Sequence, residues 1–419
     1  MIGTRYLVLS FTYLLTTILF IDRVAISTAK EQITSEIALT DTQFGWILSA
    51  FALGYAIFQA PAGAIADRYG PRVVLTGIVI AWSIFTVFTG LAWGLVSLIL
   101  FRFLFGVAEA GYFPSCARII YLWFPAKERA LAQGVNLSGT RVGAAFTLPA
   151  VAWLVASAGW RNTFFILGAG GILWAVVWFI WFRDAPENHA GVAQSELTLI
   201  ASGRGVSAEK AKPLPAAVLW RSPNLLLAMG QYFASCFTFF FSITWLFPHL
   251  QRTYELDAVQ TGFFAAAPLL GGAVGNWVGG ALVNALHRRG HISNCYGYVA
   301  IAGFLLAVLG LVGTLTADNA VWAVAWLTLA IFGSDMTLPP SWAFCIAIGG
   351  PHSGVVSGMM NMSGNIGCFV SALAFPYMLG AFGSTDQFFI AAIVLCLGAA
   401  FLWTKVRPDQ ALNERFIRA

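Results

Sequence analysis

The stretch QFGWILSAFALGYAIFQAPAGAIADRYGPR, residues 43–72, carries no charged side chain before Asp67 and then ends in a short basic loop. About 20 mostly apolar residues are enough to cross a bilayer as an α-helix. We therefore predict a membrane-spanning helix over residues 43–67, with Arg68 and Arg72 just beyond its end.

The composition of the whole chain agrees with a membrane protein. Of its 419 residues, 59% are hydrophobic and only 10% are charged, and the mean hydropathy is +0.78. Soluble domains carry about 25% charged residues, so we expect no soluble fold. The six cysteines lie in apolar stretches without CxxC or metal-ligand spacing, and the chain has no nucleophile–base set or phosphate loop. We expect no enzymatic activity, no metal and no cofactor.

Twelve stretches are long and apolar enough to span a membrane. They cover residues 6–29, 43–67, 73–93, 95–124, 130–157, 161–182, 223–251, 258–286, 293–316, 319–347, 353–380 and 386–404. The longest polar stretch separates six spans from six. We predict an all-α membrane protein of twelve transmembrane helices, forming two pseudo-symmetric six-helix bundles around a central cavity. The predicted parts are a bundle over 1–182, a cytoplasmic linker over 183–222, a bundle over 223–404 and a cytoplasmic tail over 405–419.

A weak internal repeat supports this division. The segment GAIADRYGPR at residues 63–72 follows the second span, and GALVNALHRRG at residues 280–290 follows the eighth. In each, a glycine is followed four residues later by a polar residue, Asp67 or Asn284, and then by basic residues. Internal duplication on this scale is typical of secondary transporters.

Lysine and arginine outside the spans fix the expected orientation, because cytoplasmic loops carry an excess of both. With the N-terminus inside, the inner residues are Arg5, Arg68, Arg72, Lys127, Arg129, Arg183, Arg204, Lys210, Lys212, Arg221, Arg288, Arg289, Lys405, Arg407, Arg415 and Arg418. Only Lys30, Arg161 and Arg252 fall on the outer side of the membrane in this orientation. We therefore expect a bacterial inner-membrane protein with both termini in the cytoplasm.

Charged side chains also occur inside the predicted spans. The acids are Asp22, Glu109 and Asp335, and the arginines are Arg23, Arg102, Arg118 and Arg141. A charge in hydrocarbon costs at least about 2.5 kcal/mol. These groups should therefore face one another, a bound ion or a water-filled cavity.

The spacing of four of these charges predicts a cluster. Arg102 and Glu109 are two helical turns apart and share one face of their helix. The first span runs in the opposite direction and brings Asp22 and Arg23 to a matching depth. We expect Asp22 to meet Arg102, and both Arg23 and Glu109 to reach the central cavity.

The string GxxxDRxGxR at residues 63–72, the twelve spans and the central basic loop resemble the major facilitator superfamily over the whole chain. Within it, three elements resemble the anion:cation symporter family, which includes bacterial sugar-acid carriers and the animal sialic acid and vesicular glutamate carriers. These elements are Asp22-Arg23, the run RFLFGVAEAGYFP at residues 102–114, and the run GSDMTLPPSW at residues 333–342.

This resemblance implies roles for the charged cluster. Arg23 stands at the family position that binds the substrate carboxylate, and Asp22 and Glu109 match the acids that carry protons. A guanidinium suits the first task because it offers a planar two-bond fork and keeps its charge. Tyr55 matches a family tyrosine that faces the substrate, and Arg102 completes the binding set. The alternative is a buried ion-pair network that only fixes helix packing.

The resemblance also implies an inner gate. Asp67 caps or pairs across the cytoplasmic helix ends, and Arg68 and Arg72 hold the gate by hydrogen bonds. Glu128 and Arg129, after the fourth span, resemble the companion gate element. The alternative for the arginines is that they only follow the charge rule for cytoplasmic loops.

The second half offers further candidates. Ser341, Asn361 and Asn365 are candidates for recognising substrate hydroxyls, or else helix-packing residues. Pro339 and Pro340 should interrupt the tenth span and free backbone carbonyls.

Three arginine and aspartate positions have roles that the sequence leaves open. Asp335 could be a third proton site, an acceptor for substrate hydroxyls, or a partner for a residue on another helix. We expect Arg118 and Arg141 to be inner-cavity or inter-helix partners rather than primary ligands.

Two positions depart from the sugar-acid carriers. Phe20 stands where those carriers often have a tyrosine, and Thr140-Arg141 stands where an uncharged amide is expected. A smaller, more apolar or aromatic carboxylate therefore remains open as the substrate.

The sequence thus predicts a proton-coupled symporter for an organic anion, a sugar acid or related carboxylate, working by alternating access. Two alternatives are an uncoupled or exchange carrier and a receptor that binds a carboxylate without moving it. The expected partners are the organic anion, protons and the lipid bilayer, with no nucleic acid, and the expected state is a monomer.

Overall fold

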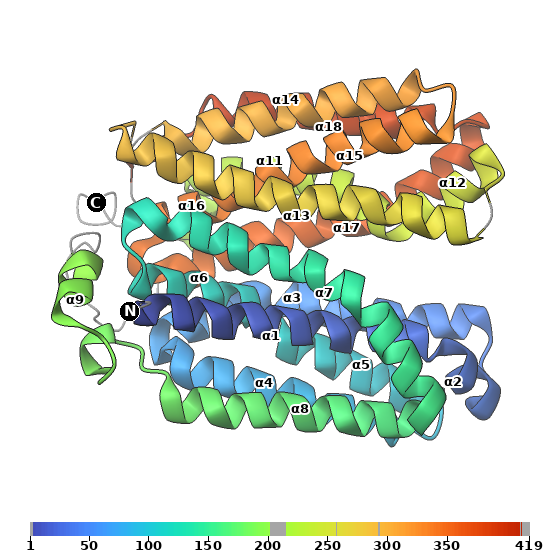
Figure 1. Ribbon diagram of the computed structural model, residues 1–419, viewed down its shortest axis with the longest axis horizontal. Helices are drawn as coiled ribbons and strands as arrows, with labels where there is room; N and C mark the ends of the chain where they lie inside the picture. The colour runs from blue at the N-terminus through green and yellow to red at the C-terminus, as the bar shows by residue number, and fades with distance from the viewer. Residues whose placement is uncertain (1–2, 202–214, 257, 292–293, 411, 413–419) are drawn as a thin grey trace. The chain divides into compact units, whose positions relative to one another are not determined.

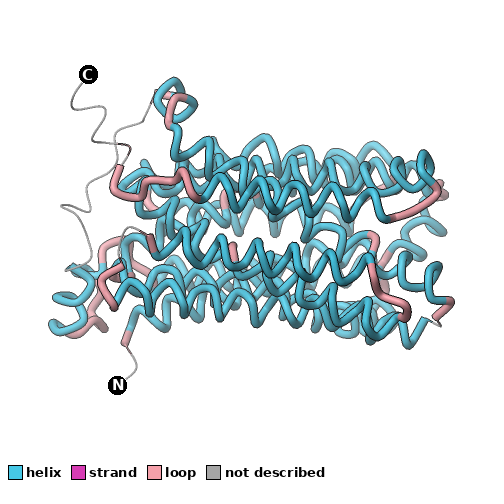
Figure 2. The backbone as a smooth tube through the Cα atoms, turned by 90° about the horizontal axis from the view of Figure 1, so that it is seen from above, coloured by secondary structure: helices cyan, strands magenta, loops and turns pink. Residues whose placement is uncertain are grey.

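The computed structural model describes residues 3–201, 215–256, 258–291, 294–410 and 412, and these residues form helices joined by loops, without a β-strand (Figure 2). Residues 202–214 of the predicted linker and most of the tail lie outside this range, including Arg204, Lys210, Lys212, Arg415 and Arg418. The prediction of an all-helical membrane protein is confirmed.

Ten segments of the described residues are long and apolar enough to cross a membrane. They are Thr4–Thr28, Gln43–Tyr69, Pro71–Gly90, Leu95–Trp123, Ala150–Trp181, Pro223–Thr244, Phe263–Arg288, Cys295–Leu315, Ala320–Phe382 and Asp386–Trp403. Some join successive helices; Ala320–Phe382 alone is 63 residues long. Twelve spans with pseudo-symmetry stay a prediction.

The chain divides into two compact units, which we call unit 1 and unit 2. Unit 1 comprises Met1–Pro125, Val142–Pro213 and Pro351–Gly358, and unit 2 comprises Ala126–Arg141, Leu214–Gly350 and Met359–Ala419. Two helices, α7 (Arg129–Ala158) and α17 (Ser353–Phe382), contribute residues to both units. The domain boundaries predicted from the sequence stay a prediction.

Unit 1 contains most of the helices from α1 to α9, which are labelled in Figure 1. They are α1 (Thr4–Thr28), α2 (Lys30–Ile37), α3 (Asp41–Tyr69), α4 (Pro71–Gly90), α5 (Leu95–Glu109), α6 (Tyr112–Trp123), the later part of α7, α8 (Trp160–Trp181) and α9 (Gln194–Ala201). The turn from α3 to α4 has a local cause, because Gly70 has a φ of +86° and Pro71 opens α4.

Glu196 of α9 holds the beginning of α1. Its carboxylate accepts the backbone N–H groups of Thr4 and Arg5 at 2.9 and 3.1 Å and pairs with the Arg5 guanidinium at 3.0 Å. A carboxylate is favoured there because the first amides of a helix lack partners and carry partial positive charge.

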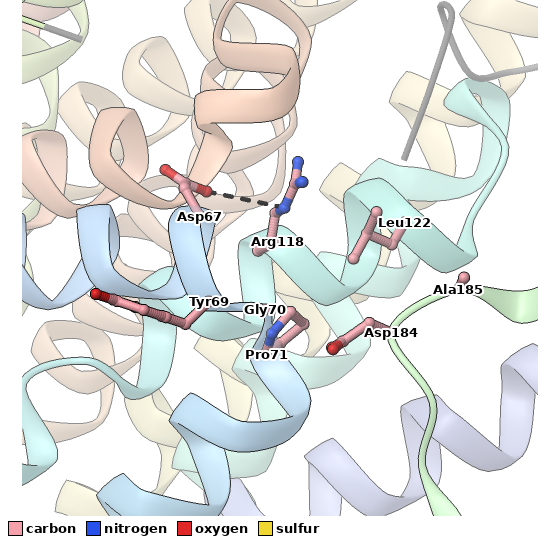
Figure 3. A pocket seen from close by; sticks show the side chains of 8 residues that line it. All are labelled: Asp67, Tyr69, Gly70, Pro71, Arg118, Leu122, Asp184 and Ala185. Carbon is pink, nitrogen blue, oxygen red and sulfur yellow. Dashed lines mark ion pairs between the residues drawn. The ribbon is translucent and has the colours of Figure 1, made fainter. Parts of the chain in front are cut away.

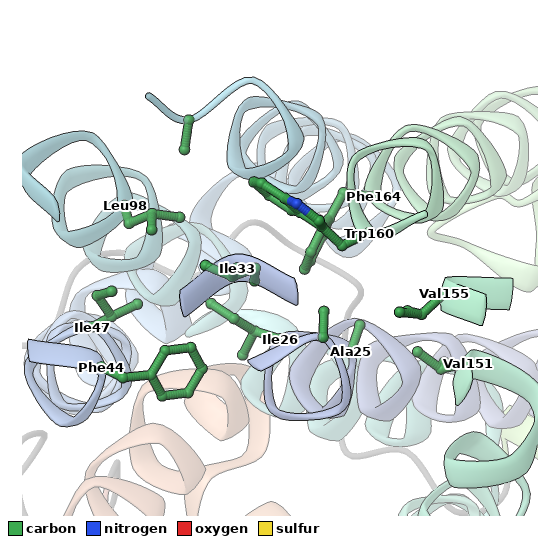
Figure 4. Close-up of a cluster of buried hydrophobic side chains, with 12 residues drawn as sticks. Ala25, Ile26, Ile33, Phe44, Ile47, Leu98, Val151, Val155, Trp160 and Phe164 are labelled. Carbon is green, nitrogen blue, oxygen red and sulfur yellow. The ribbon is translucent and has the colours of Figure 1, made fainter. Parts of the chain in front are cut away.

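A buried apolar cluster fixes the end of α1 that follows Asp22 and Arg23 (Figure 4). Ala25 and Ile26 of α1 pack there with Ile33 of α2 and residues of four further helices. The members of the cluster are Ala25, Ile26, Ala29, Ile33, Phe44, Ile47, Ala92, Leu98, Val151, Val155, Trp160 and Phe164. The charged residues of α1 are therefore carried by a well-packed helix.

Unit 2 is also helical. Its elements are the first part of α7, α10 (Ala216–Trp220), α11 (Pro223–Thr244), α12 (Leu246–Tyr254), α13 (Ala258–Arg288), α14 (Cys295–Leu315), α15 (Ala320–Met336), α16 (Leu338–Gly349), the later part of α17 and α18 (Asp386–Trp403). The interruption expected at Pro339 and Pro340 is confirmed, since α15 ends at Met336 and α16 begins at Leu338. A proline donates no N–H and clashes with the carbonyl four residues earlier.

Candidate functional site

The centre of unit 1 contains an ion pair between α1 and α5. Arg23 Nε donates to Glu109 Oε1 at 2.8 Å, and the two side chains are 19% and 0% exposed. The contact uses one hydrogen bond, so the two-bond capacity of the guanidinium is not filled by Glu109. Within the described residues, Arg23 Nη2 and Glu109 Oε2 are buried without a hydrogen-bond partner.

Aromatic rings surround the Arg23 guanidinium. Its carbon lies 4.4 Å from the centre of the Tyr55 ring, 5.2 Å from that of Phe51 and 5.4 Å from that of Phe20. Cation–π contacts of this kind hold a guanidinium in place without using its N–H groups. Arg23 is thus oriented by rings and by Glu109 together.

A second arginine lies beside this pair. Arg102 is 2% exposed, and its guanidinium packs on Phe105 at 4.5 Å and on Phe51 at 5.0 Å. It is within electrostatic range of Glu109 and Asp22. The four charges therefore form one cluster, as the spacing predicts.

Asp22 and Arg102 interact electrostatically, but no hydrogen bond joins them in the described part of the chain. Asp22 is 1% exposed, and neither of its carboxyl oxygens has a hydrogen-bond partner among the residues that the structure describes. Arg102 Nε is likewise without one. A buried polar atom without a partner costs about 1–3 kcal/mol, and each such atom calls for an explanation, such as a functional role or a bound water or ion.

Close packing of α3 on α5 brings this cluster together. A side chain at Gly106 would meet the Phe51 carbonyl and would lie 3.0 Å from Tyr55 N, so only glycine allows the approach. Gly106 stands between Arg102 and Glu109 on α5, and Phe51 and Tyr55 are one turn apart on α3. The rings of one helix therefore lie beside the charges of the other.

Unit 2 contains a different ion pair. Arg141 of α7 donates to both carboxyl oxygens of Asp335, from Nε at 2.8 Å and from Nη2 at 2.9 Å. Its Nη1 donates to Thr140 Oγ1 at 3.2 Å, and the centre of the Phe239 ring lies 3.5 Å from the guanidinium carbon. Asn276 Nδ2 of α13 also donates to Asp335 at 3.3 Å. Of the roles left open for Asp335, this geometry favours a partner for another helix.

The candidates for hydroxyl recognition lie in unit 2 in different surroundings. Ser341 is fully buried and donates to Gln231 Oε1 at 3.2 Å and to the Thr337 carbonyl at 2.7 Å. Asn365 is partly exposed and donates to the Asn361 carbonyl at 2.8 Å. The Nδ2 of Asn361 is buried and has no hydrogen-bond partner among the described residues. Asn361 and Asn365 retain polar capacity, whereas Ser341 is used in packing.

Asp67 caps the start of α17 inside unit 1. Its carboxylate accepts from Gly354 N at 2.9 Å and Val355 N at 2.8 Å, and Arg118 Nε of α6 lies 3.9 Å away. Asp67 and Arg118 line a pocket of about 120 Å³ (Figure 3). Arg118 and Arg141 are both inter-helix partners, as expected.

The remaining gate candidates occupy varied positions. Arg72 donates from Nε and Nη2 to the Phe179 carbonyl at 2.9 and 2.8 Å, which joins α4 to α8 within unit 1. Arg68 is exposed beside the Tyr69 ring. Glu128 and Arg129 belong to the segment Ala126–Arg141 of unit 2. The structure thus places Arg72 in a contact within one unit.

Sequence reasoning missed four residues around these charges, Phe51, Phe105, Phe239 and Asn276. Phe51 could have been found, because it is four residues before Tyr55 on the same helix. Phe105 is three residues after Arg102 and was open to the same argument. Nothing in the sequence connects Phe239 or Asn276 to charges on distant segments.

The sequence model of the Major Facilitator Superfamily matches residues 12–372, so the chain belongs to this family of membrane transporters and is not an enzyme. The resemblance inferred from the sequence is confirmed. Among curated relatives, the chain is similar to the probable sulfoacetate transporter SauU of Cupriavidus necator, with 36% identity over 99% of this chain and 98% of that protein. It is also similar to the probable galactarate/D-glucarate transporter GudP of Escherichia coli, with 32% identity over 91% and 88%.

Solved structures show the same fold. The proton:xylose symporter XylE has a TM-score of 0.75 at 13% identity, covering 96% of each chain. The human organic anion transporter MFSD10 has a TM-score of 0.71 at 15% identity, covering 96% of this chain and 99% of that one.

Proposed function

We propose that this protein is a proton-coupled symporter that carries a small organic anion across the bacterial inner membrane by alternating access. The observation that carries the proposal is the Arg23–Glu109 pair, a one-bond contact at 2.8 Å between a partly exposed arginine and a fully buried acid. An arginine with unfilled hydrogen-bonding capacity can take an anion, and an acid next to it can exchange a proton for the lost contact.

Arg23 is the proposed primary ligand of the substrate's anionic group. Arg102 adds a second positive charge, and Tyr55 lines the same place with its ring 4.4 Å from the Arg23 guanidinium. Ser341, Asn361 and Asn365 of unit 2 are proposed to recognise substrate hydroxyls, and the unused polar atoms of Asn361 and Asn365 support this role for those two. Relatives named for sulfoacetate and for galactarate or D-glucarate support an organic anion as the substrate class.

Asp22 and Glu109 are the proposed proton carriers. When the substrate's anion binds Arg23, the Glu109 carboxylate loses its 2.8 Å hydrogen bond, and a buried acid without its cation favours the protonated form. Asp22 is buried without a hydrogen-bond partner in the described chain, which favours the same behaviour. Asp335 is a third candidate, but its pairing with Arg141 supports a packing role.

Asp67, Arg68, Arg72, Glu128 and Arg129 are the proposed inner gate. The hydrogen bonds from Gly354 and Val355 to Asp67 support it, because a carboxylate at a helix N-terminus stabilises one arrangement of two helices. Opening the gate would break these two bonds.

The distribution of lysine and arginine supports an orientation with both termini in the cytoplasm. The proposed working unit is a monomer in the lipid bilayer, with protons and the organic anion as partners and no nucleic acid.

The test is uptake of a labelled organic anion into proteoliposomes that contain the purified protein. With a more acidic medium outside, we expect accumulation above equilibrium, and we expect it to stop when both the pH gradient and the membrane potential are collapsed. Uptake that is unchanged by this collapse would refute coupling. Counterflow that needs substrate on both sides, without net uptake, would instead identify an exchanger.

A further inference from the structure

We infer that the substrate is a compact dianion, such as a dicarboxylate or a sulfonated carboxylate, and that two protons accompany it in an electroneutral cycle. This inference rests on the proposed function and names the substrate class of the same site. It starts from the charges in unit 1, where two acids, Asp22 and Glu109, face two arginines, Arg23 and Arg102.

The charges of this cluster tie the number of transported protons to the charge of the ligand. With both acids ionised the cluster is neutral, and with both protonated it carries two positive charges. A dianion then makes the loaded cluster neutral again. The empty and the loaded forms therefore both avoid net charge in a membrane interior, where net charge is strongly disfavoured. A monoanion would keep the loaded cluster neutral with one proton instead of two, so the number of protons follows from the charge of the ligand.

Two unfilled guanidinium groups provide the contacts. Arg23 Nη2 and Arg102 Nε are both buried without a hydrogen-bond partner in the described part of the chain. Arg102 is 2% exposed, so its orphan donor lies inside the protein and not in the solvent. Two arginines on different helices, α1 and α5, suit a ligand with two anionic groups better than a ligand with one.

The surroundings favour a compact ligand over a polyhydroxylated one. Three of the rings beside the guanidinium groups of Arg23 and Arg102, those of Phe20, Phe51 and Phe105, offer no hydrogen bond to a hydroxyl, whereas the phenol of Tyr55 beside Arg23 can form one. A buried hydroxyl without a partner weakens binding. A short ligand can place both anionic groups on the arginines without burying hydroxyls against these rings.

The other buried pair does not alter this count. Arg141 and Asp335 neutralise each other through two hydrogen bonds at 2.8 and 2.9 Å. Unit 2 therefore supplies no unpaired charge from this pair that would favour a monoanion.

The experiment compares ligands that differ by one charge. Malonate and its monoamide, and sulfoacetate and 2-hydroxyethanesulfonate, are measured by ligand-induced thermal shift and by proteoliposome uptake, at a pH where the acid groups are ionised. Galactonate is the polyhydroxylated monoanion. We expect each dianion to bind about tenfold or more tightly than its matched monoanion, as one charge-assisted hydrogen bond implies. We also expect dianion uptake to be unchanged by a membrane potential imposed with potassium and valinomycin.

Variants of Arg102 test whether this residue causes the preference for dianions over monoanions. Arg102→Gln should lower the ratio of dianion to monoanion affinity by about tenfold, and Arg102→Lys should restore part of it. Arg161→Gln is the control, because it removes one arginine from an ion pair with Glu36 whose two side chains are 36% and 50% exposed. It should leave the ratio unchanged. Folding of each variant is checked by its elution as a monodisperse species.

Tighter binding of galactonate or of the matched monoanions, or dianion uptake driven by membrane potential, would overturn the inference while leaving proton-coupled symport intact. An unchanged ratio in a folded Arg102→Gln variant would also overturn it. Failure of every anion to accumulate under a pH gradient would overturn the proposed function, and the inference with it.

Discussion

Two of the buried arginine–acid pairs, one in each unit, have the same chemistry but differ in how many hydrogen bonds join the arginine to the acid. In unit 1, Arg23 makes one hydrogen bond to Glu109 and is 19% exposed. In unit 2, Arg141 makes two hydrogen bonds to Asp335 and is 7% exposed. The first pair keeps unused polar atoms, and the second uses them internally. The difference supports a functional role for the incomplete pair and a packing role for the complete one.

The position of the two acids makes this comparison sharper. Glu109 is the last residue of α5, and Asp335 is the residue before the last of α15. Both therefore lie at a helix C-terminus, where the helix dipole disfavours a negative charge. Each acid is stabilised by its arginine, but only Asp335 accepts hydrogen bonds from the arginine at both of its carboxyl oxygens.

The largest effect is expected on removing one member of the complete pair. Asp335→Asn leaves the Arg141 charge buried without compensation, and breaking such a pair typically destabilises by about 3–5 kcal/mol. The thermal unfolding midpoint in detergent should fall strongly. The double variant Arg141→Met/Asp335→Leu removes both charges and should recover most of this loss. A parent-like midpoint for Asp335→Asn would show that the pair is not the packing element we describe.

A smaller effect, on binding and not on folding, is expected at the incomplete pair. Arg23→Lys keeps the charge but lacks the planar fork, so affinity for the anion should fall by about 1.5–3 kcal/mol, or tenfold to a hundredfold. Isothermal titration of the transported anion measures the loss, and the unfolding midpoint should stay close to that of the parent. Near-normal affinity would reassign Arg23 to packing.

Glu109→Gln should separate exchange from accumulation. Glutamine keeps the shape but carries no titrating proton, so labelled and unlabelled substrate should still exchange across the membrane. Gradient-driven accumulation should fall by about tenfold for a gradient of one pH unit, the contribution of one proton. The same variant at Asp22, Asp22→Asn, is the companion measurement. Parent-like accumulation in Glu109→Gln would move the coupling role to Asp335.

The smallest effect is expected at an exposed pair between Glu36 of α2 and Arg161 near the start of α8. The indole N–H of Trp160 donates to Glu36 at 2.6 Å, and Arg161 pairs with the same carboxylate at 2.9 Å. These contacts lower the pKa of Glu36, first through Trp160 and then through Arg161. A lowered pKa stabilises the fold above the unfolded-state value, and this contribution disappears as the pH falls through the folded-state pKa.

Glu36→Gln should therefore lower the unfolding midpoint slightly at neutral pH, and the difference from the parent should vanish in acid. Glu31→Gln on the same helix is the control, because Glu31 stands outside this contact. A difference that persists or grows in acid would contradict the account.

Much of the fold could be predicted because each span is a local property. Apolar length decides whether a segment crosses a membrane, and Pro339 decides where α15 ends without any distant contact. The depth match between α1 and α5 follows from helix geometry alone, which is why the charged cluster was expected.

Partner choice within the cluster could not be predicted in the same way. Arg23 and Arg102 both reach the acids, and the selection of Glu109 by Arg23 depends on rings from α3 that lie close only because Gly106 lets the helices approach. The Arg141–Asp335 pair joins residues 194 positions apart, and helical periodicity carries no information over that separation.

Gly272 gives the complete pair a property useful to protein engineers. A side chain there would collide with the Asp335 carboxylate, so adding a single methyl group would push the acid without changing any charge. Replacing Gly272 by alanine and then by serine would displace the Asp335 carboxylate to an increasing extent. Temperature-sensitive variants at this position would allow the activity of the transporter to be lowered in steps in living cells, which deletion of the gene does not allow.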